Sequence, residues 1–165
     1  MNQITKSYWK TIGITTLIVG ILDLCLAFGM QWYYSGNFPS TMLKRMAGGV
    51  LGLETSLNGG TEMALVGLLL HFFISFCWTY AVFLIFPYFE FAKLRKEAMF
   101  LFGIVYTPVV NLFMHFVALP LSRLSPPKEF TMNSVGFILF SIGFTIPIFY
   151  MAWMHFRHRL FAKQN

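Results

Sequence analysis

Charged residues are scarce in this chain. Of its 165 residues only 11% are charged, and twelve Lys and Arg stand against six Asp and Glu. Hydrophobic residues make up 57% of the chain, aromatic residues 19%, and the mean hydropathy is +0.66. A soluble globular domain carries about 25% charged residues. The shortage of charge therefore excludes an ordinary soluble domain and indicates an integral membrane protein.

Sequence signatures of a disulfide, of common enzyme sites and of nucleic-acid binding are missing as well. The two cysteines, Cys25 and Cys77, lie in apolar segments at different expected depths, so we expect no disulfide. No phosphate-binding loop and no nucleophile triad can be found. The basic residues lie in short groups beside apolar segments and form no continuous stripe, so we expect no nucleic-acid partner, despite a net charge of +6.

Four apolar segments are long enough to cross a bilayer, which takes roughly 20 residues of helix. These predicted spans cover residues 11–33, 62–86, 98–121 and 133–156. They belong to one transmembrane domain, residues 1–165. The sequence therefore predicts an all-α protein, an integral membrane four-helix bundle in contact with the lipid bilayer.

The basic residues predict the orientation of the spans. Eight lie on the side of both termini, namely Lys6, Lys10, Lys93, Arg95, Lys96, Arg157, Arg159 and Lys163. Four lie on the other side, namely Lys44, Arg45, Arg123 and Lys128. Because Lys and Arg accumulate in cytoplasmic loops, we expect both termini in the cytoplasm.

The first outer loop contains more than a linker. Apolar residues at helical spacing predict a short amphipathic helix over about residues 40–55, with Ser40 as its N-cap. Glycines at 48, 49 and 52 within this segment, and at 59 and 60 after it, allow close backbone approach and a sharp turn. The pattern leaves open whether this helix lies on the membrane surface or re-enters the bilayer.

Polar residues recur at helical spacing in every span. Asp23, His71, Asn111 and His115 fall roughly 9–15 Å from the outer ends of their spans, at about 1.5 Å per residue. Four polar residues on three helices therefore predict a polar layer in the outer half of the bundle. An ionisable residue at such a depth is costly unless it faces protein or water, and it often marks a ligand or proton site. The layer offers Asp23 as a partner for His71.

Further polar residues lie around this layer. Ser75, Thr107 and Ser141 form a secondary polar stripe on the inward faces of their spans. Glu54 and Glu62 fall near the outer mouth of the layer. They serve either as gating or ligand-steering residues or as ordinary residues of a solvated loop and a first helical turn.

Four sequence stretches resemble small four-span bacterial inner-membrane proteins, including the YagU-like proteins. They are ILDLCLAF, AGGVLGLE, VGLLLHFFISF and FGIVYTPVVNLFMHFVALPLSRLSPP, and the resemblance runs from about residue 20 to 147. The matching positions are Asp23, His71, Asn111, His115 and Pro120. The resemblance implies a four-span fold in the bacterial inner membrane and implies no reaction. This chain departs from the pattern in the fourth span, where Phe137 follows Gly136.

Three functions remain open at this point. The polar layer could handle a small ligand or ion by proton-coupled binding or permeation, which with four spans would require a homodimer. Alternatively, the protein is a non-catalytic structural or accessory subunit of a membrane complex, in which polar residues only hold helices together. A third possibility is a haem b or divalent-metal site formed by His71 and His115. Whether any reaction is catalysed is undetermined.

Overall fold

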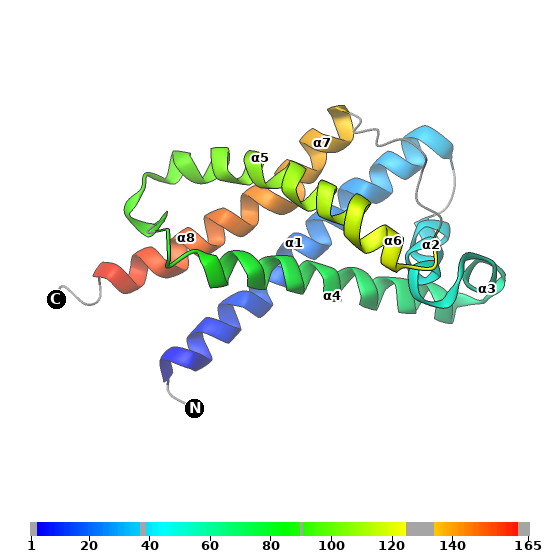
Figure 1. The fold of residues 1–165 in the computed structure, drawn as a ribbon, viewed down its shortest axis with the longest axis horizontal. Helices are drawn as coiled ribbons and strands as arrows, with labels where there is room; N and C mark the ends of the chain where they lie inside the picture. The colour runs from blue at the N-terminus through cyan, green and yellow to red at the C-terminus, as the bar shows by residue number, and fades with distance from the viewer. Residues whose placement is uncertain (1–2, 37–38, 90, 125–133, 162–165) are drawn as a thin grey trace.

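A computed structural model describes residues 3–36, 39–89, 91–124 and 134–161. Over these residues the chain is mostly helical and contains no strand (Figure 1). Four of its helical stretches are long and apolar enough to cross a membrane, namely Lys6–Tyr34, Thr61–Ile85, Lys96–Leu121 and Ser134–Arg157. The predicted all-α four-helix bundle is thereby confirmed, and the chain is a multi-pass membrane protein.

The first and second spans are continuous α-helices, and the third and fourth are interrupted. The first two are α1 (Gln3–Ser35) and α4 (Thr61–Ile85). The third consists of α5 (Lys96–Phe113), the π-helical segment η2 (Met114–Ala118) and α6 (Leu119–Leu121). The fourth consists of α7 (Ser134–Phe140), the π-helical segment η3 (Ser141–Thr145) and α8 (Ile146–Phe161).

The first loop folds as two helices where the sequence predicted one. These are α2 (Pro39–Leu51) and α3 (Leu53–Asn58). Gly52 separates them because its φ of 94° lies in the left-handed region, which an L side chain rarely adopts. α2 packs closely on α4, where Gly67 lies directly against the backbone carbonyl of Leu43.

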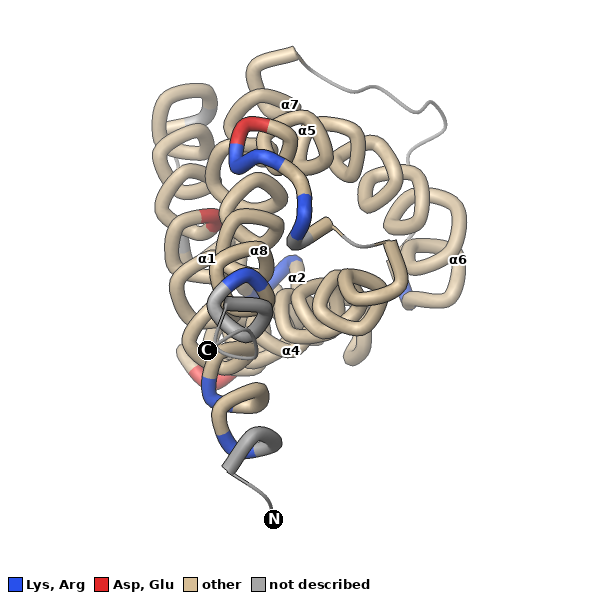
Figure 2. Tube along the Cα trace, turned by 90° about the vertical axis from the view of Figure 1, so that its left-hand side faces the viewer, with Lys and Arg blue, Asp and Glu red and all other residues tan. Residues whose placement is uncertain are grey.

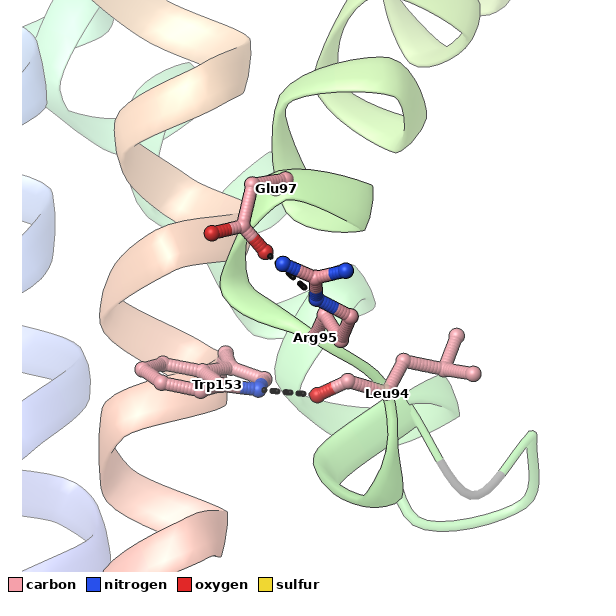
Figure 3. A network of polar contacts seen from close by, with 4 residues as sticks. All are labelled: Leu94, Arg95, Glu97 and Trp153. Carbon is pink, nitrogen blue, oxygen red and sulfur yellow. Dashed lines mark hydrogen bonds and ion pairs between the residues drawn. The ribbon is translucent and has the colours of Figure 1, made fainter.

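The two ends of the bundle are packed differently. The end that carries the termini holds a continuous core of aliphatic and aromatic side chains from α1, α4, α5 and α8. Phe83, Phe86 and Ile148 are fully buried there. At the same end, the Trp153 Nε1–H of α8 donates a hydrogen bond to the Leu94 carbonyl, 3.0 Å away, and so holds the α4–α5 connection (Figure 3).

Basic residues are concentrated at the tightly packed end. Figure 2 looks along the bundle from the side of the termini, and most of the blue segments lie at this end. Lys6, Lys10, Lys93, Arg95, Lys96 and Arg157 belong to the segments at this end, and α8 also contains Arg159. Lys44, Arg45 and Arg123 belong to the segments at the opposite end. Lys128, Lys163 and the first residue of the predicted fourth span lie outside the described residues.

The four spans do not all approach each other equally closely. α1 packs on α4 and α8, and α5 packs on α8, but the backbones of α4 and α5 come close at few points or none, although these helices follow each other in the chain. Side chains such as Trp78 on α4 and Tyr106 on α5 make the contact between them. In Figure 1, α5 lies above α4, and both cross in front of the diagonal helices α1 and α8. The contact between α4 and α5 is therefore made by side chains and not by closely packed backbones.

Candidate functional site

His71 lies on the buried face of α4. Its neighbours on this face at spacings of four, Gly67, Ser75 and Thr79, are buried too. The His71 side chain is 8% exposed, and its Nε2 lies 3.0 Å from the Gly20 carbonyl of α1. Because a carbonyl can only accept, Nε2 carries the proton in this hydrogen bond. The observed hydrogen-bond partner of His71 is therefore a backbone carbonyl one helical turn before Asp23.

A cavity of about 400 Å³ lies beside this contact. Its walls come from α1, α2, α4, α5, η2, α6, α7, η3 and residues 122 and 124. Four lining residues have polar side chains, namely Asp23, His71, Ser75 and Ser122, and the remainder are glycine or mainly aliphatic and aromatic residues. A largely apolar cavity with a few convergent polar groups is the usual form of a small-molecule site, and such sites measure about 300–1,000 Å³.

Asp23 supplies the only acidic side chain of the cavity wall. It is half-buried, and within the described part of the chain its carboxylate has no hydrogen bond or ion pair. A carboxylate without a partner inside a membrane span is expensive, by a few kcal/mol or more. The cavity therefore presents one polar group whose hydrogen-bonding capacity the described protein does not use.

Asn111 and His115 lie apart from the cavity. The Asn111 Nδ2 donates to the carbonyl of Thr107 on its own helix, 2.9 Å away. His115 lies in η2 and packs edge-on against the Phe116 ring, with centroids 4.8 Å apart. Neither residue lines the cavity. Of the predicted polar layer, the structure thus brings Asp23 and His71 to one cavity and places Asn111 and His115 elsewhere.

The secondary polar stripe divides into two places. Ser75 lines the cavity, whereas Thr107 and Ser141 meet at the interface of α5 with η3. The Thr107 hydroxyl lies 2.8 Å from those of both Ser141 and Thr145, and all three side chains are buried. This hydroxyl cluster satisfies its own hydrogen bonds, so it holds two helices together and leaves no polar group for a ligand.

Two prolines account for the π-helical segments that border the cavity. Pro120 and Pro147 each lie two residues after a π segment. A proline has no N–H to donate to the carbonyl four residues earlier, and its ring clashes with that carbonyl. The affected carbonyls belong to Phe116 and Gly143, which lie inside η2 and η3. The helices therefore widen where they line the cavity, as π segments often do at functional sites.

The acidic residues assigned to the outer mouth are exposed and do not line the cavity. Glu54 lies in the first turn of α3. Glu62 lies in the first turn of α4, where its Oε1 accepts a hydrogen bond from the Gly60 backbone N–H, 2.7 Å away. In this structure the Glu62 side chain thus binds the backbone of the residue that precedes its own helix.

Ligands for a metal do not gather in the described part of the chain. No group of three or more His, Cys, Asp or Glu side chains is found there. His71 and His115, the pair considered for haem b or a divalent metal, do not share the cavity. The Nε2 of His71 is also engaged with Gly20. This arrangement favours a hydrogen-bonding role for His71.

Trp78 is a cavity residue that our sequence analysis did not identify. It follows His71 by seven residues and therefore lies on nearly the same face of α4. Its ring contacts those of Tyr106 and Phe113 on α5, with centroid distances of 5.9 and 5.1 Å. The spacing of seven from a polar residue was the signal available in the sequence.

The comparisons with known proteins found no relative of this chain. No protein-family model, curated protein or solved structure matches the chain.

Proposed function

We propose that this protein binds a small amphiphilic molecule in the cavity between its spans. The apolar body of the ligand lies against side chains such as Val110 and Phe144, and its polar head lies at Asp23 and His71. The observation that carries the proposal is the Asp23 carboxylate, which faces a 400 Å³ apolar cavity without a partner in the described part of the chain. A ligand head group supplies that partner.

Binding is coupled to a proton in this proposal. An unpaired carboxylate in an apolar wall is costly, so Asp23 holds a proton when the cavity has no ligand and passes this proton to the ligand where the ligand head is basic. Permeation across the bilayer would require a second copy of the chain, because four spans are few for a transport path.

We place the protein in the bacterial inner membrane with both termini in the cytoplasm. The excess of basic residues at the end that carries the termini supports this orientation. The resemblance to the YagU-like proteins also supports a location in the bacterial inner membrane.

Equilibrium dialysis of the protein in lipid nanodiscs tests the proposal. Three probes share one apolar body and differ in the head, namely 2-naphthylmethylamine, 2-naphthylmethanol and 2-naphthoic acid, and empty nanodiscs measure partition into lipid. We expect saturable binding of at least one probe. Val110→Phe should abolish it because Val110 is 2% exposed and lines the cavity. Val109→Phe, on the exposed side of the same helix, is the matched control. Absence of saturable binding for all three probes would refute the function.

A further inference from the structure

We infer that the ligand is a lipophilic amine that enters the cavity from within the bilayer, between α4 and α5. The inference rests on the proposed function and adds the chemical class of the ligand and its route. It follows from the charge of the cavity wall, from the sparse backbone contacts between α4 and α5, and from the depth at which these helices line the cavity.

Among the described residues, the wall of the cavity carries one acidic group and no Lys or Arg. The hydrogen bond that His71 makes is donated from Nε2 to the Gly20 carbonyl, which leaves its other ring nitrogen, Nδ1, as an acceptor. A carboxylate and an imidazole acceptor complement a head group that is positively charged and donates hydrogen bonds. An amine that takes up the Asp23 proton has both properties, whereas an alcohol and a carboxylate cannot form such an ion pair.

Side chains of α4 and α5 line the cavity between these two helices. The other neighbouring spans approach each other more closely along their backbones than these two do. Trp78 from α4 lies across the gap in edge-to-face contact with Tyr106 and Phe113 of α5. Ile74 and Val110 line the cavity next to it, and Ile74 is 38% exposed. Rotation of a few side chains would open this side without separating packed helices.

The end of the cavity away from the termini is covered. The Arg123 backbone N–H donates to the Gly49 carbonyl of α2, 2.9 Å away, and so ties the end of the third span to α2. Ser122 and Leu124, on either side of this hydrogen bond, line the cavity, as do Met46 and Gly49. A backbone hydrogen bond and a packed helix close this end, in contrast to the side-chain contacts between α4 and α5.

The opening between α4 and α5 lies at the depth of the hydrocarbon. His71 is ten residues and Trp78 seventeen residues after Thr61, the first residue of α4, which corresponds to about 15 and 26 Å along the helix. Trp78 is also about 10 Å from the last residue of α4. A molecule that passes between these helices therefore arrives through lipid, so it must dissolve in the bilayer.

Head-group selectivity tests the ligand class. A charge-assisted hydrogen bond in a desolvated site should make 2-naphthylmethylamine bind about tenfold tighter than 2-naphthylmethanol, and the naphthoate should bind weakest. Asp23→Asn keeps the shape of the side chain and should reduce the preference to within about twofold. Equal affinities of the wild-type protein for the amine and the alcohol would overturn the ligand class and leave the proposed function standing. Absence of any saturable binding would overturn both.

Binding kinetics test the route. Phe113 contacts Trp78 but does not line the cavity, so Phe113→Ala weakens the closure without changing the cavity wall. Loss of an edge-to-face pair should raise the association and dissociation rates of the amine by the same factor, about two- to tenfold, with unchanged Kd. Leu112→Ala, also exposed and one residue away, is the control and should change neither rate. Unchanged rates in Phe113→Ala would overturn the route, and a role in stability alone would move Tm without moving both rates together.

Discussion

Gly103 lies where α5 and α8 approach each other closely, so a single added methyl group there should destabilise the bundle. A Cβ atom at Gly103 would lie 2.6 Å from the Ile146 Cα and 2.9 Å from its backbone nitrogen. Aliphatic carbons normally pack at about 3.5–4.0 Å. In Gly103→Ala, α5 and α8 must therefore separate by about 1 Å, because backbone atoms cannot rotate away.

The cost of this separation follows from the neighbouring contacts. Overpacking of a close interface costs about 1–3 kcal/mol. The two hydroxyl contacts of Thr107, both 2.8 Å long, lie one turn further on and would be stretched past hydrogen-bonding distance. Each such bond contributes about 0.6 kcal/mol in a membrane protein. We expect Gly103→Ala to lower the free energy of unfolding by about 2–4 kcal/mol.

Unfolding in mixed micelles, followed by far-UV circular dichroism, measures this change. Gly13→Ala is the matched control, since a Cβ at Gly13 of α1 meets nothing within 4 Å. A second variant adds Ile146→Ala to Gly103→Ala, which removes the Cγ1 contact at 2.7 Å but leaves the Cα and N contacts. We expect only partial recovery. If Gly103→Ala unfolds like Gly13→Ala, the close approach of α5 and α8 is refuted.

Two further substitutions test other parts of the fold. Thr107→Val keeps the shape of the side chain but removes the hydroxyl that contacts Ser141 and Thr145. It should lower the free energy of unfolding by about 1–2 kcal/mol in the same assay. An unchanged unfolding curve would contradict the hydroxyl cluster. Gly52→Ala forces an L side chain into a φ of 94° and should cost about 1–3 kcal/mol. Gly49→Ala, also in the first loop, is its control and should stay near the wild-type stability, because a Cβ there meets only ordinary contacts, the shortest 3.8 Å.

The helical bundle was predictable because long apolar runs leave few alternatives. A run of 24 or more apolar residues can satisfy its backbone in lipid only as a helix. Spacings of three and four residues likewise placed His71 and Ser75 on one face of a helix, and both line the cavity. The break at Gly52 was missed because helical spacing does not reveal a positive φ.

The arrangement of the polar residues was less accessible from the sequence. The partner of His71 is a backbone carbonyl, and backbone carbonyls have no residue signature. Asn111 shares a face with Thr107, which turns toward η3 and away from the cavity. His115 lies inside a π segment, whose wider turn shifts every following side chain around the helix. The depth of a residue along its span therefore predicted membership of the site less well than the direction of its side chain around the helix axis.

The contact between Gly20 and His71 lies at the midpoint of the first span, where a tilt of the helix displaces the backbone least. Gly20 is 14 residues from both Lys6 and Tyr34, the ends of the first span, so it is the midpoint of a helix about 43 Å long. A hydrocarbon core is about 30 Å thick, and a longer helix can fit a thinner bilayer by tilting. For a change in tilt of about 10° the helix ends swing by almost 4 Å, whereas Asp23, about 4.5 Å from the midpoint, moves less than about 1 Å. The proposed ligand site lies near the midpoint of α1, where a change in bilayer thickness displaces the helix least.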